Sequence, residues 1–187
     1  MISDEKVTYI KFFAPVIPQS TNALMEVVDD QVRKGFNKIV LLISTPGGSV
    51  HHGISIYNYL KGLNVKVETH NFGSVDSIGS VLYCAGEKRY SVKNARFLIH
   101  PVQMQFQANQ SFEEKQIEEK LNSLRIDEKN LSSIIASETD KNISDILKAI
   151  QCRTTLLPPD AIKFGLVHKI KDELIPAGAN LISINMS

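Results

Sequence analysis

The feature that most constrains the fold is the alternation of short apolar strands with helical stripes in the first half of the chain. Strands are predicted at Val7–Phe13, Lys38–Ile43 and Lys66–Asn71, and apolar residues recur at helical spacing between each pair. This order is typical of parallel strands joined by crossover helices, so the sequence predicts an α/β fold. A chain of 187 residues is long enough for one core and short for two ordinary domains, so we expect a single domain over residues 1–187.

The second half of the chain is predicted to add a buried helix, strands, a long helix and a short closing unit. In chain order these elements are a helix over Ser77–Ala85, a strand over Arg96–His100, a strand with one apolar face within Pro101–Gln110, a long amphipathic helix opened by a capping box at Ser111–Glu114, a short helix from Pro158 to Gly165, and a final strand over Leu166–Ile170. The long helix has a heavily charged face, and we expect it to project from the body as an arm.

Charge and hydropathy exclude two classes of partner. The 21 Lys and Arg residues against 20 Asp and Glu residues leave a net charge of +1, which provides no field to gather nucleic acid. No apolar run approaches the roughly 20 residues that a membrane span needs. Met1–Lys6 carries charges of both signs, unlike an export leader. We therefore expect a soluble, cytoplasmic protein that binds neither nucleic acid nor membrane.

The residues that commonly hold metals or cofactors are scattered. Cys84 and Cys152 fit neither a disulfide framework nor a zinc spacing, and neighbours such as His51 and His52 do not share a face of a helix. Neither glycine turn is followed by the Gly-Lys-Ser/Thr of a phosphate loop. We expect no metal and no cofactor.

Two glycine-bearing turns, each between a strand and a helix, are where chemistry is most expected. Such turns direct backbone N–H groups at a common point. The hydroxyl of Ser77 and the N–H of Ile78 would then face the same cavity as the N–H groups around Gly48, which is the geometry that binds a developing oxyanion. A serine hydroxyl needs a base to act as a nucleophile, and His100 at the next strand end has the side chain that suits this task near pH 7.

Simpler interpretations of the same residues stay open. A Gly-Gly turn is often only a tight turn, Ser77 can serve as a helix cap, and Asp76 is expected to cap that helix or to face away from the cavity. The nucleophile elbow of α/β-hydrolases does not apply, because that pattern needs glycine where Val75 stands. A Ser–Lys pair with Lys88 or Lys93 is a further alternative.

Four stretches together resemble the Clp protease proteolytic subunit family in order and spacing. They are Leu42–Tyr57 (LISTPGGSVHHGISIY), Gly73–Gly79 (GSVDSIG), Ala95–His100 (ARFLIH) and Ala161–Val167 (AIKFGLV). The resemblance implies a ClpP/crotonase-like fold, in which β-β-α units repeat in a right-handed superhelix.

The resemblance also implies roles for individual residues. By position it makes Ser77 the nucleophile, His100 the general base, and the N–H groups of Gly48 and Ile78 the oxyanion hole. Residues expected to contact substrate lie beside these positions, and they are Gly47, Ser49, Val50 and Val102. The expected activity is hydrolysis of peptide bonds in peptides or unfolded proteins.

The resemblance further implies an assembly. We expect a ring-type homo-oligomer to which the long helix contributes. The family works with an ATP-driven unfoldase, and this sequence has no nucleotide-binding loop, so any ATP dependence would come from a partner.

One departure from the family pattern concerns the third member of the triad. The family has an aspartate at the position that falls on Arg153. The candidates left to orient His100 are Asp145, Asp160, Thr154, Thr155 or a backbone carbonyl. A serine, a base and an oxyanion hole without the aspartate retain part of the rate enhancement, so a slow enzyme is expected.

Two other functions compete with a peptidase. Arg153 motivates a catalytically silent or conditional subunit that assembles with an active partner. The more distant alternative is crotonase-type chemistry on acyl thioesters, because that superfamily shares the fold and the pair of oxyanion-binding N–H groups. Ser77 and His100 in motif context argue against it.

Overall fold

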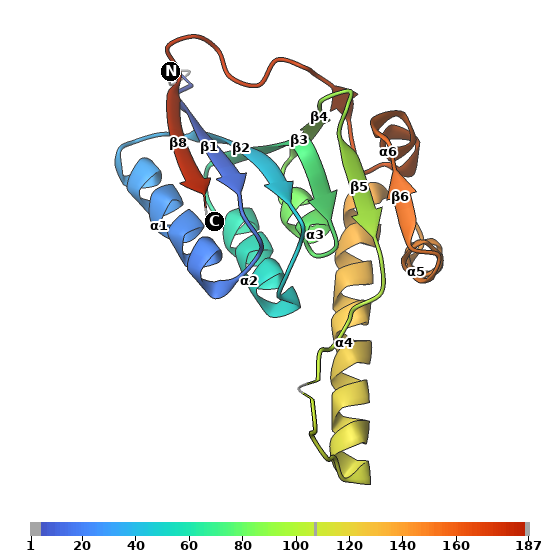
Figure 1. Cartoon of the computed structure of the whole chain (residues 1–187). Helices are drawn as coiled ribbons and strands as arrows, with labels where there is room; N and C mark the ends of the chain where they lie inside the picture. The colour runs from blue at the N-terminus through green and yellow to red at the C-terminus, as the bar shows by residue number, and fades with distance from the viewer. Residues whose placement is uncertain (1–4, 107, 186–187) are drawn as a thin grey trace.

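The fold is a mixed α/β body with a long helical arm, seen in a computed structural model that describes residues 5–106 and 108–185 (Figure 1). The strands are β1 (Val7–Phe13), β2 (Lys38–Thr45), β3 (Lys66–Asp76), β4 (Lys88–Ser91), β5 (Arg96–Ile99), β6 (Thr154–Leu156), β7 (Lys169–Ile170) and β8 (Asn180–Asn185). The helices are α1 (Pro18–Arg33), α2 (Val50–Lys61), α3 (Gly79–Tyr83), α4 (Glu114–Thr139), α5 (Ile143–Gln151) and α6 (Pro158–Phe164). The predicted α/β class is therefore confirmed. Most of Met1–Lys6 lies outside the described residues.

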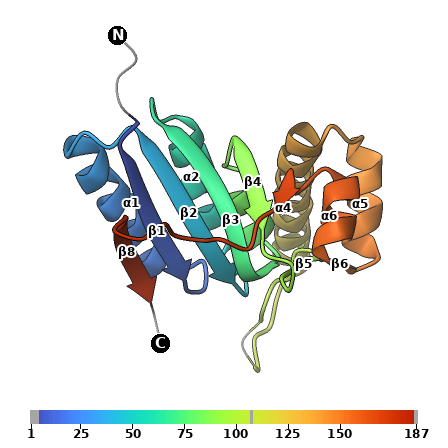
Figure 2. The ribbon, with the colours of Figure 1, turned by 90° about the horizontal axis from the view of Figure 1, so that it is seen from above.

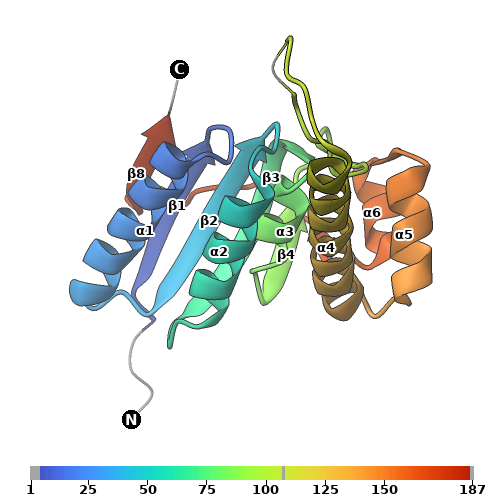
Figure 3. The same ribbon diagram turned by 90° about the horizontal axis from the view of Figure 1, so that it is seen from below.

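The body is one sheet whose main strand order is β6-β5-β3-β2-β1-β8, with β4 pairing with β3 and with β7. All pairs are parallel except β5 with β6. Helices α1, α2 and α4 lie side by side along one face of the sheet (Figures 2 and 3). Ile10, Phe12, Leu41 and Ile43 are fully buried within the core. The predicted alternation of strand and crossover helix is confirmed over β1 to β3.

The buried helix α3 begins later than predicted. It starts at Gly79 rather than Ser77, because Ser77 has a positive φ of 58° that cannot continue a right-handed helix. All five residues of α3 are buried, and Tyr83 packs edge-on against Phe97 of β5 with ring centroids 5.1 Å apart. This packing fixes α3, the helix that follows Ser77, against β5.

The arm consists of the first half of α4 and the segment that runs along it from β5 (Figure 1). The predicted capping box at Ser111 is wrong: the helix is capped at Glu113, whose N–H donates to the side chain of Gln116. The predicted strand after Pro101 is also absent from residues 101–106, because no neighbouring strand pairs with them; Gln107 lies outside the described residues. Within the described residues, no helix combines the length and the apolar character needed to cross a membrane.

The C-terminal part adds a strand that the sequence patterns did not predict. The short helix α6 ends at Gly165 as predicted, but the following strand β7 contains only two residues and is not the last. The chain then returns across the sheet, and β8 pairs in parallel with β1 at its edge. The side chain of Asn180 fixes this strand by donating to Thr8 and to Gln31.

Candidate active site

The candidate site is a cavity of about 560 Å³ where the start of α2, the turn after β3 and the end of β5 meet. Five predicted site residues line it, and they are Gly48, Val50, Ser77, His100 and Val102. Leu131 of α4 forms part of its wall. The structure therefore brings together in one cavity residues that stand far apart in the sequence.

Ser77 occupies a sharp turn between β3 and α3. Its backbone has a φ of 58°, a conformation that costs on the order of 1–3 kcal/mol for a residue other than glycine. The turn is held by the Ser77 N–H, which donates to the carbonyl of Leu98 at 2.7 Å, and by the Ser77 carbonyl, which accepts from Ser80 at 3.0 Å. The Oγ of Ser77 has no hydrogen-bond partner among the described residues, so its hydroxyl is free toward the cavity.

The Gly47–Gly48 turn is joined to the end of β1. The Val16 N–H donates to Gly47 and the Ser49 N–H donates to Val16, both at 2.8 Å. Both glycines have positive φ, and a Cβ at Gly48 would lie 2.3 Å from the Val16 carbonyl oxygen, whereas one at Gly47 would lie 2.7 Å from the Cβ of Ser77. Only glycine fits at either position.

Two backbone N–H groups beside Ser77 lack protein partners. Within the described part of the chain, neither the N–H of Gly48 nor that of Ile78 donates to a protein acceptor. The Ile78 side chain is fully buried against Gly53 of α2, which fixes the position of its peptide group. Unpaired donors near a serine hydroxyl can stabilise an anionic oxygen.

His100 lies just beyond β5 and is half-buried. Its Nδ1 is 2.8 Å from the carbonyl oxygen of Pro101. A carbonyl oxygen only accepts, so this hydrogen bond requires the tautomer with the proton on Nδ1. In the neutral imidazole with this tautomer, Nε2 is the nitrogen that can take a proton.

The predicted substrate contacts fall into two groups. Val50 and Val102 line the cavity together with Leu131, so its wall is partly apolar. The other two residues do not line the cavity. The Oγ of Ser49 lies 2.8 Å from Nδ1 of His52 on α2, and Gly47 packs closely against the side chain of Ser77.

The predicted alternatives for orienting His100 differ in position. Asp160 pairs with Lys163 on the exposed side of α6, and Asp145 lines a separate cavity with Cys152, so neither bonds to His100. The registers of β5 with β6 place Thr154 opposite Ile99 and Thr155 opposite Leu98. The only orienting hydrogen bond among the described residues is the one to a backbone carbonyl.

Asp76 was predicted to cap the helix or to face away from the cavity; it does not cap α3, and it is not among the residues that line the cavity. It is the last residue of β3, and its carboxylate forms an ion pair with Arg96 of β5 at 2.7 Å. Burial raises the pKa of Asp76, and the charges of Arg96 and His100 oppose that rise. Local sequence could not reveal this contact, because it depends on the register between two strands.

The Ser–Lys alternative is not supported by the geometry. Lys88 and Lys93 are exposed, and Lys93 lies 3.8 Å from Asp172. Neither lysine lines the Ser77 cavity.

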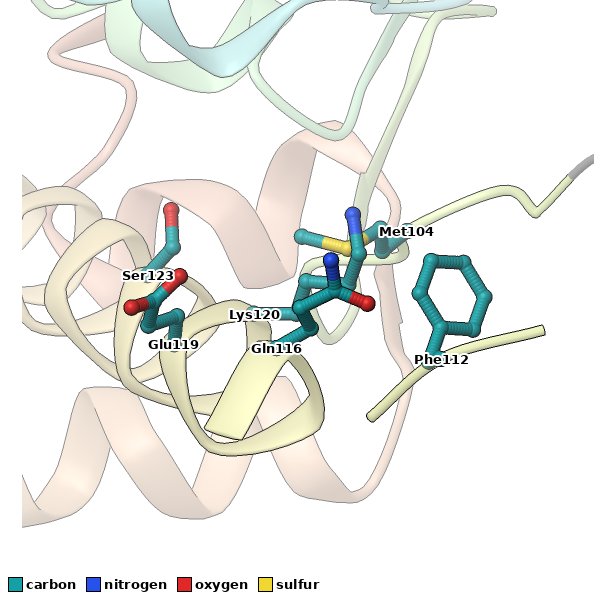
Figure 4. A pocket seen from close by; sticks show the side chains of 6 residues that line it. All are labelled: Met104, Phe112, Gln116, Glu119, Lys120 and Ser123. Atoms are coloured by element: carbon teal, nitrogen blue, oxygen red, sulfur yellow. The ribbon is translucent and has the colours of Figure 1, made fainter. Parts of the chain in front are cut away.

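A second cavity, of about 450 Å³, lies on the arm between α4 and the segment before it (Figure 4). Its lining residues are Met104, Phe112, Gln116, Glu119, Lys120 and Ser123. Ser123 has no histidine beside it in this lining, so the cavity does not offer the serine–base pair of the first one. Within the described residues, no three His, Cys, Asp or Glu side chains gather into a metal site.

Comparison with known proteins supplies independent information. The model of the Clp protease family matches residues 17–173. The chain is also 30% identical over 164 residues to the ATP-dependent Clp protease proteolytic subunit of Deinococcus radiodurans, an alignment that covers 85% of this chain and 78% of that protein.

Proposed function

The chain belongs to the Clp protease family, and from that premise we propose that it is a serine endopeptidase with Ser77 as nucleophile and His100 as general base. The observation that carries the proposal is the cavity itself. It is lined by Ser77 with a free hydroxyl on a strained turn, by His100 with an available Nε2, and by Gly48 with an unpaired N–H. The second unpaired N–H belongs to Ile78, the residue after Ser77. These are the groups that acyl transfer requires.

The proposed reaction proceeds in two halves. The Oγ of Ser77 attacks the peptide carbonyl carbon while its proton passes to Nε2 of His100. The N–H groups of Gly48 and Ile78 stabilise the resulting oxyanion, and His100 then gives the proton to the leaving amine. Water, activated by the same imidazole, hydrolyses the acyl-enzyme and restores Ser77.

The proposed substrate is an extended peptide segment. Val50, Val102 and Leu131 give the cavity apolar walls, which favour an apolar side chain next to the bond that is cut. Gly47 and Ser49 lie on the turn along which the peptide backbone would run. The relative is named as ATP-dependent, and we extend to this chain both a ring-type homo-oligomer and delivery of unfolded proteins by an ATP-driven partner.

Covalent labelling tests the proposal directly. The full chain is treated with a fluorophosphonate probe, and intact mass is recorded for the wild type, Ser77→Ala and His100→Ala. We expect one adduct on the wild type, none on Ser77→Ala, and a rate at least about 1,000-fold lower on His100→Ala, because an unactivated hydroxyl is a poor nucleophile. Labelling that persists in Ser77→Ala would overturn the assignment of the nucleophile.

Arg153 supports one second candidate, a catalytically silent subunit. This residue is exposed, has a φ of 50°, and stands where the family has its triad aspartate. No adduct on a folded, assembled wild type would favour the silent subunit over the enzyme. Labelling of pure wild type at Ser77 would exclude it.

A further inference from the structure

Two strands, β6 and β3, pair with β5, which ends one residue before His100. On one side, β6 pairs with β5 so that Thr154, the residue after Arg153, is opposite Ile99, the residue before His100. A guanidinium is always charged and only donates, so it cannot accept the Nδ1–H of an imidazole or stabilise an imidazolium. The carboxylate that a serine–histidine pair normally uses therefore does not come from β6.

On the other side, β3 places a carboxylate on the same face of the sheet as His100. Asp76 is in register with Leu98, and Ser74 with Arg96. Residues two apart along a strand share a face, so the side chains of Arg96, Leu98 and His100 follow one another on the face that carries Asp76. Asp76 thus lies diagonally between Arg96 and His100.

Only one of the two carboxylate oxygens of Asp76 has a hydrogen-bond partner among the described residues. Its Oδ2 accepts from Arg96 at 2.7 Å, whereas its Oδ1 is buried and has no partner within the described residues. The whole residue is 7% exposed. A buried carboxylate oxygen without a hydrogen bond destabilises a fold, so it calls for a functional explanation.

The electrostatics of Asp76 agree with a position close to the imidazole. Burial raises the pKa of Asp76, which disfavours the charged form, and both Arg96 and His100 act in the opposite direction. Asp76 is thus the charged group of a neighbouring strand that interacts with His100, which is itself the one titratable side chain among the described residues that line the cavity.

We propose that Asp76 is the positioning residue that replaces the triad aspartate absent from β6, its Oδ1 accepting the Nδ1–H of His100 when substrate is bound. This inference rests on the proposed serine peptidase function. In the free protein Nδ1 donates to the Pro101 carbonyl, and rotation of the imidazole exchanges that acceptor for Oδ1. During the reaction the serine proton moves to Nε2 and later to the leaving amine, while Asp76 stays ionised beside the imidazolium.

The experiment compares labelling rates by the fluorophosphonate probe, from about pH 5.5 to 9, in the full chain and four variants. Asp76→Asn is expected to lower the rate about 100-fold, within the ~10⁴-fold that loss of a triad carboxylate can cause. Its acidic limb is expected to move to lower pH, because the imidazolium loses its anion. Its Tm should stay close to that of the wild type, because the amide oxygen of asparagine can still accept from Arg96 and the cost of burying a charge is removed. Asp145→Asn is the matched control and should label like the wild type.

Two rescue variants separate positioning from a structural role. Asp76→Glu is expected to retain more of the rate than Asp76→Asn, and Asp76→Asn combined with Arg153→Asp should recover at least about tenfold, because a carboxylate then reaches His100 from β6. An Asp76→Asn rate within threefold of the wild type would overturn the inference, as would a loss that neither variant rescues. Absence of Ser77 labelling in the wild type would instead overturn the proposed function itself.

Discussion

The body and the arm of this molecule differ in how far their apolar residues are buried. Around the candidate site, Val75, Ile78 and Phe97 are fully buried, so the chain itself completes the packing that positions Ser77 and His100. On the arm, Ile117 is 54% exposed and Leu121 is 44% exposed. The site is thus built within one chain, whereas the arm leaves apolar surface that agrees with the proposed assembly.

The same helix contains both kinds of environment. The first half of α4 lies on the arm, and its second half packs on the body through Leu131 and Ile135. Leu131 also lines the cavity. The helix α4 therefore connects the candidate site with the exposed apolar surface of the arm, and four predictions test how far the two regions are independent.

The largest effect is expected at Gly48 in the body. Gly48→Ala would bring a Cβ to within 2.3 Å of the Val16 carbonyl oxygen, so the turn must separate from β1 and move the Gly48 N–H. Loss of one oxyanion donor lowers the rate by about 100-fold to 1,000-fold, which labelling or peptide hydrolysis will measure. Gly35→Ala is the matched control, because Gly35 also has positive φ and has open space around it. Similar losses in both variants would contradict a local cause.

Gly53→Ala should have the next largest effect. A Cβ at Gly53 would lie 2.2 Å from Cγ1 of Ile78, a side chain that is fully buried and has nowhere to move. Overpacking of this kind costs about 1–3 kcal/mol, measurable by urea unfolding, and it should lower activity by displacing the Ile78 N–H. Ser55→Ala, on the exposed side of the same helix, serves as control. An active, fully stable Gly53→Ala would show that Ile78 is not held by packing.

A smaller effect is expected from pH, through His70 of the body. His70 is 1% exposed, its Nε2 donates to the Lys171 carbonyl, and burial lowers its pKa below the usual value of 6.5. The unfolded chain therefore binds a proton that the folded chain resists, so stability falls as the pH drops below about 6.5. Thermal unfolding should show a lower Tm at about pH 5.5 than at pH 7.5. His70→Gln should reduce the dependence of Tm on pH. If the dependence is unchanged in this variant, a group other than His70 causes it.

The smallest effect is expected on the arm. Leu121→Ser should change the free energy of unfolding of the isolated chain by no more than about 0.5 kcal/mol, because its side chain is already 44% exposed. Ile135→Ala, in the buried half of α4, should cost about 2–5 kcal/mol in the same urea titration. Equal costs would show that the arm is packed against the body in solution.

Periodicity accounts for the parts of the fold that were predicted well. β1 spans Val7–Phe13 as expected, and α6 ends at Gly165, because alternating burial and a left-handed glycine are both local signals. The strand β8 and the true start of α4 were missed. β8 is a half-exposed edge strand whose position depends on Asn180 reaching Thr8 and Gln31, residues more than 140 positions away.

The candidate site, like the fold, could be predicted from the sequence only in part. Sequence alone identified Ser77, His100 and the Gly48 turn as the candidate site residues. Their residue types and their positions at the ends of predicted strands can both be inferred from short segments of sequence. Only the tertiary structure decided that Asp76 shares a face with His100, that its Oδ1 is left unpaired, and that Thr154, the residue after Arg153, pairs opposite Ile99 of β5. The reason is physical: side-chain type and local turn geometry are properties of a segment, whereas strand register is set by contacts between segments far apart in the chain.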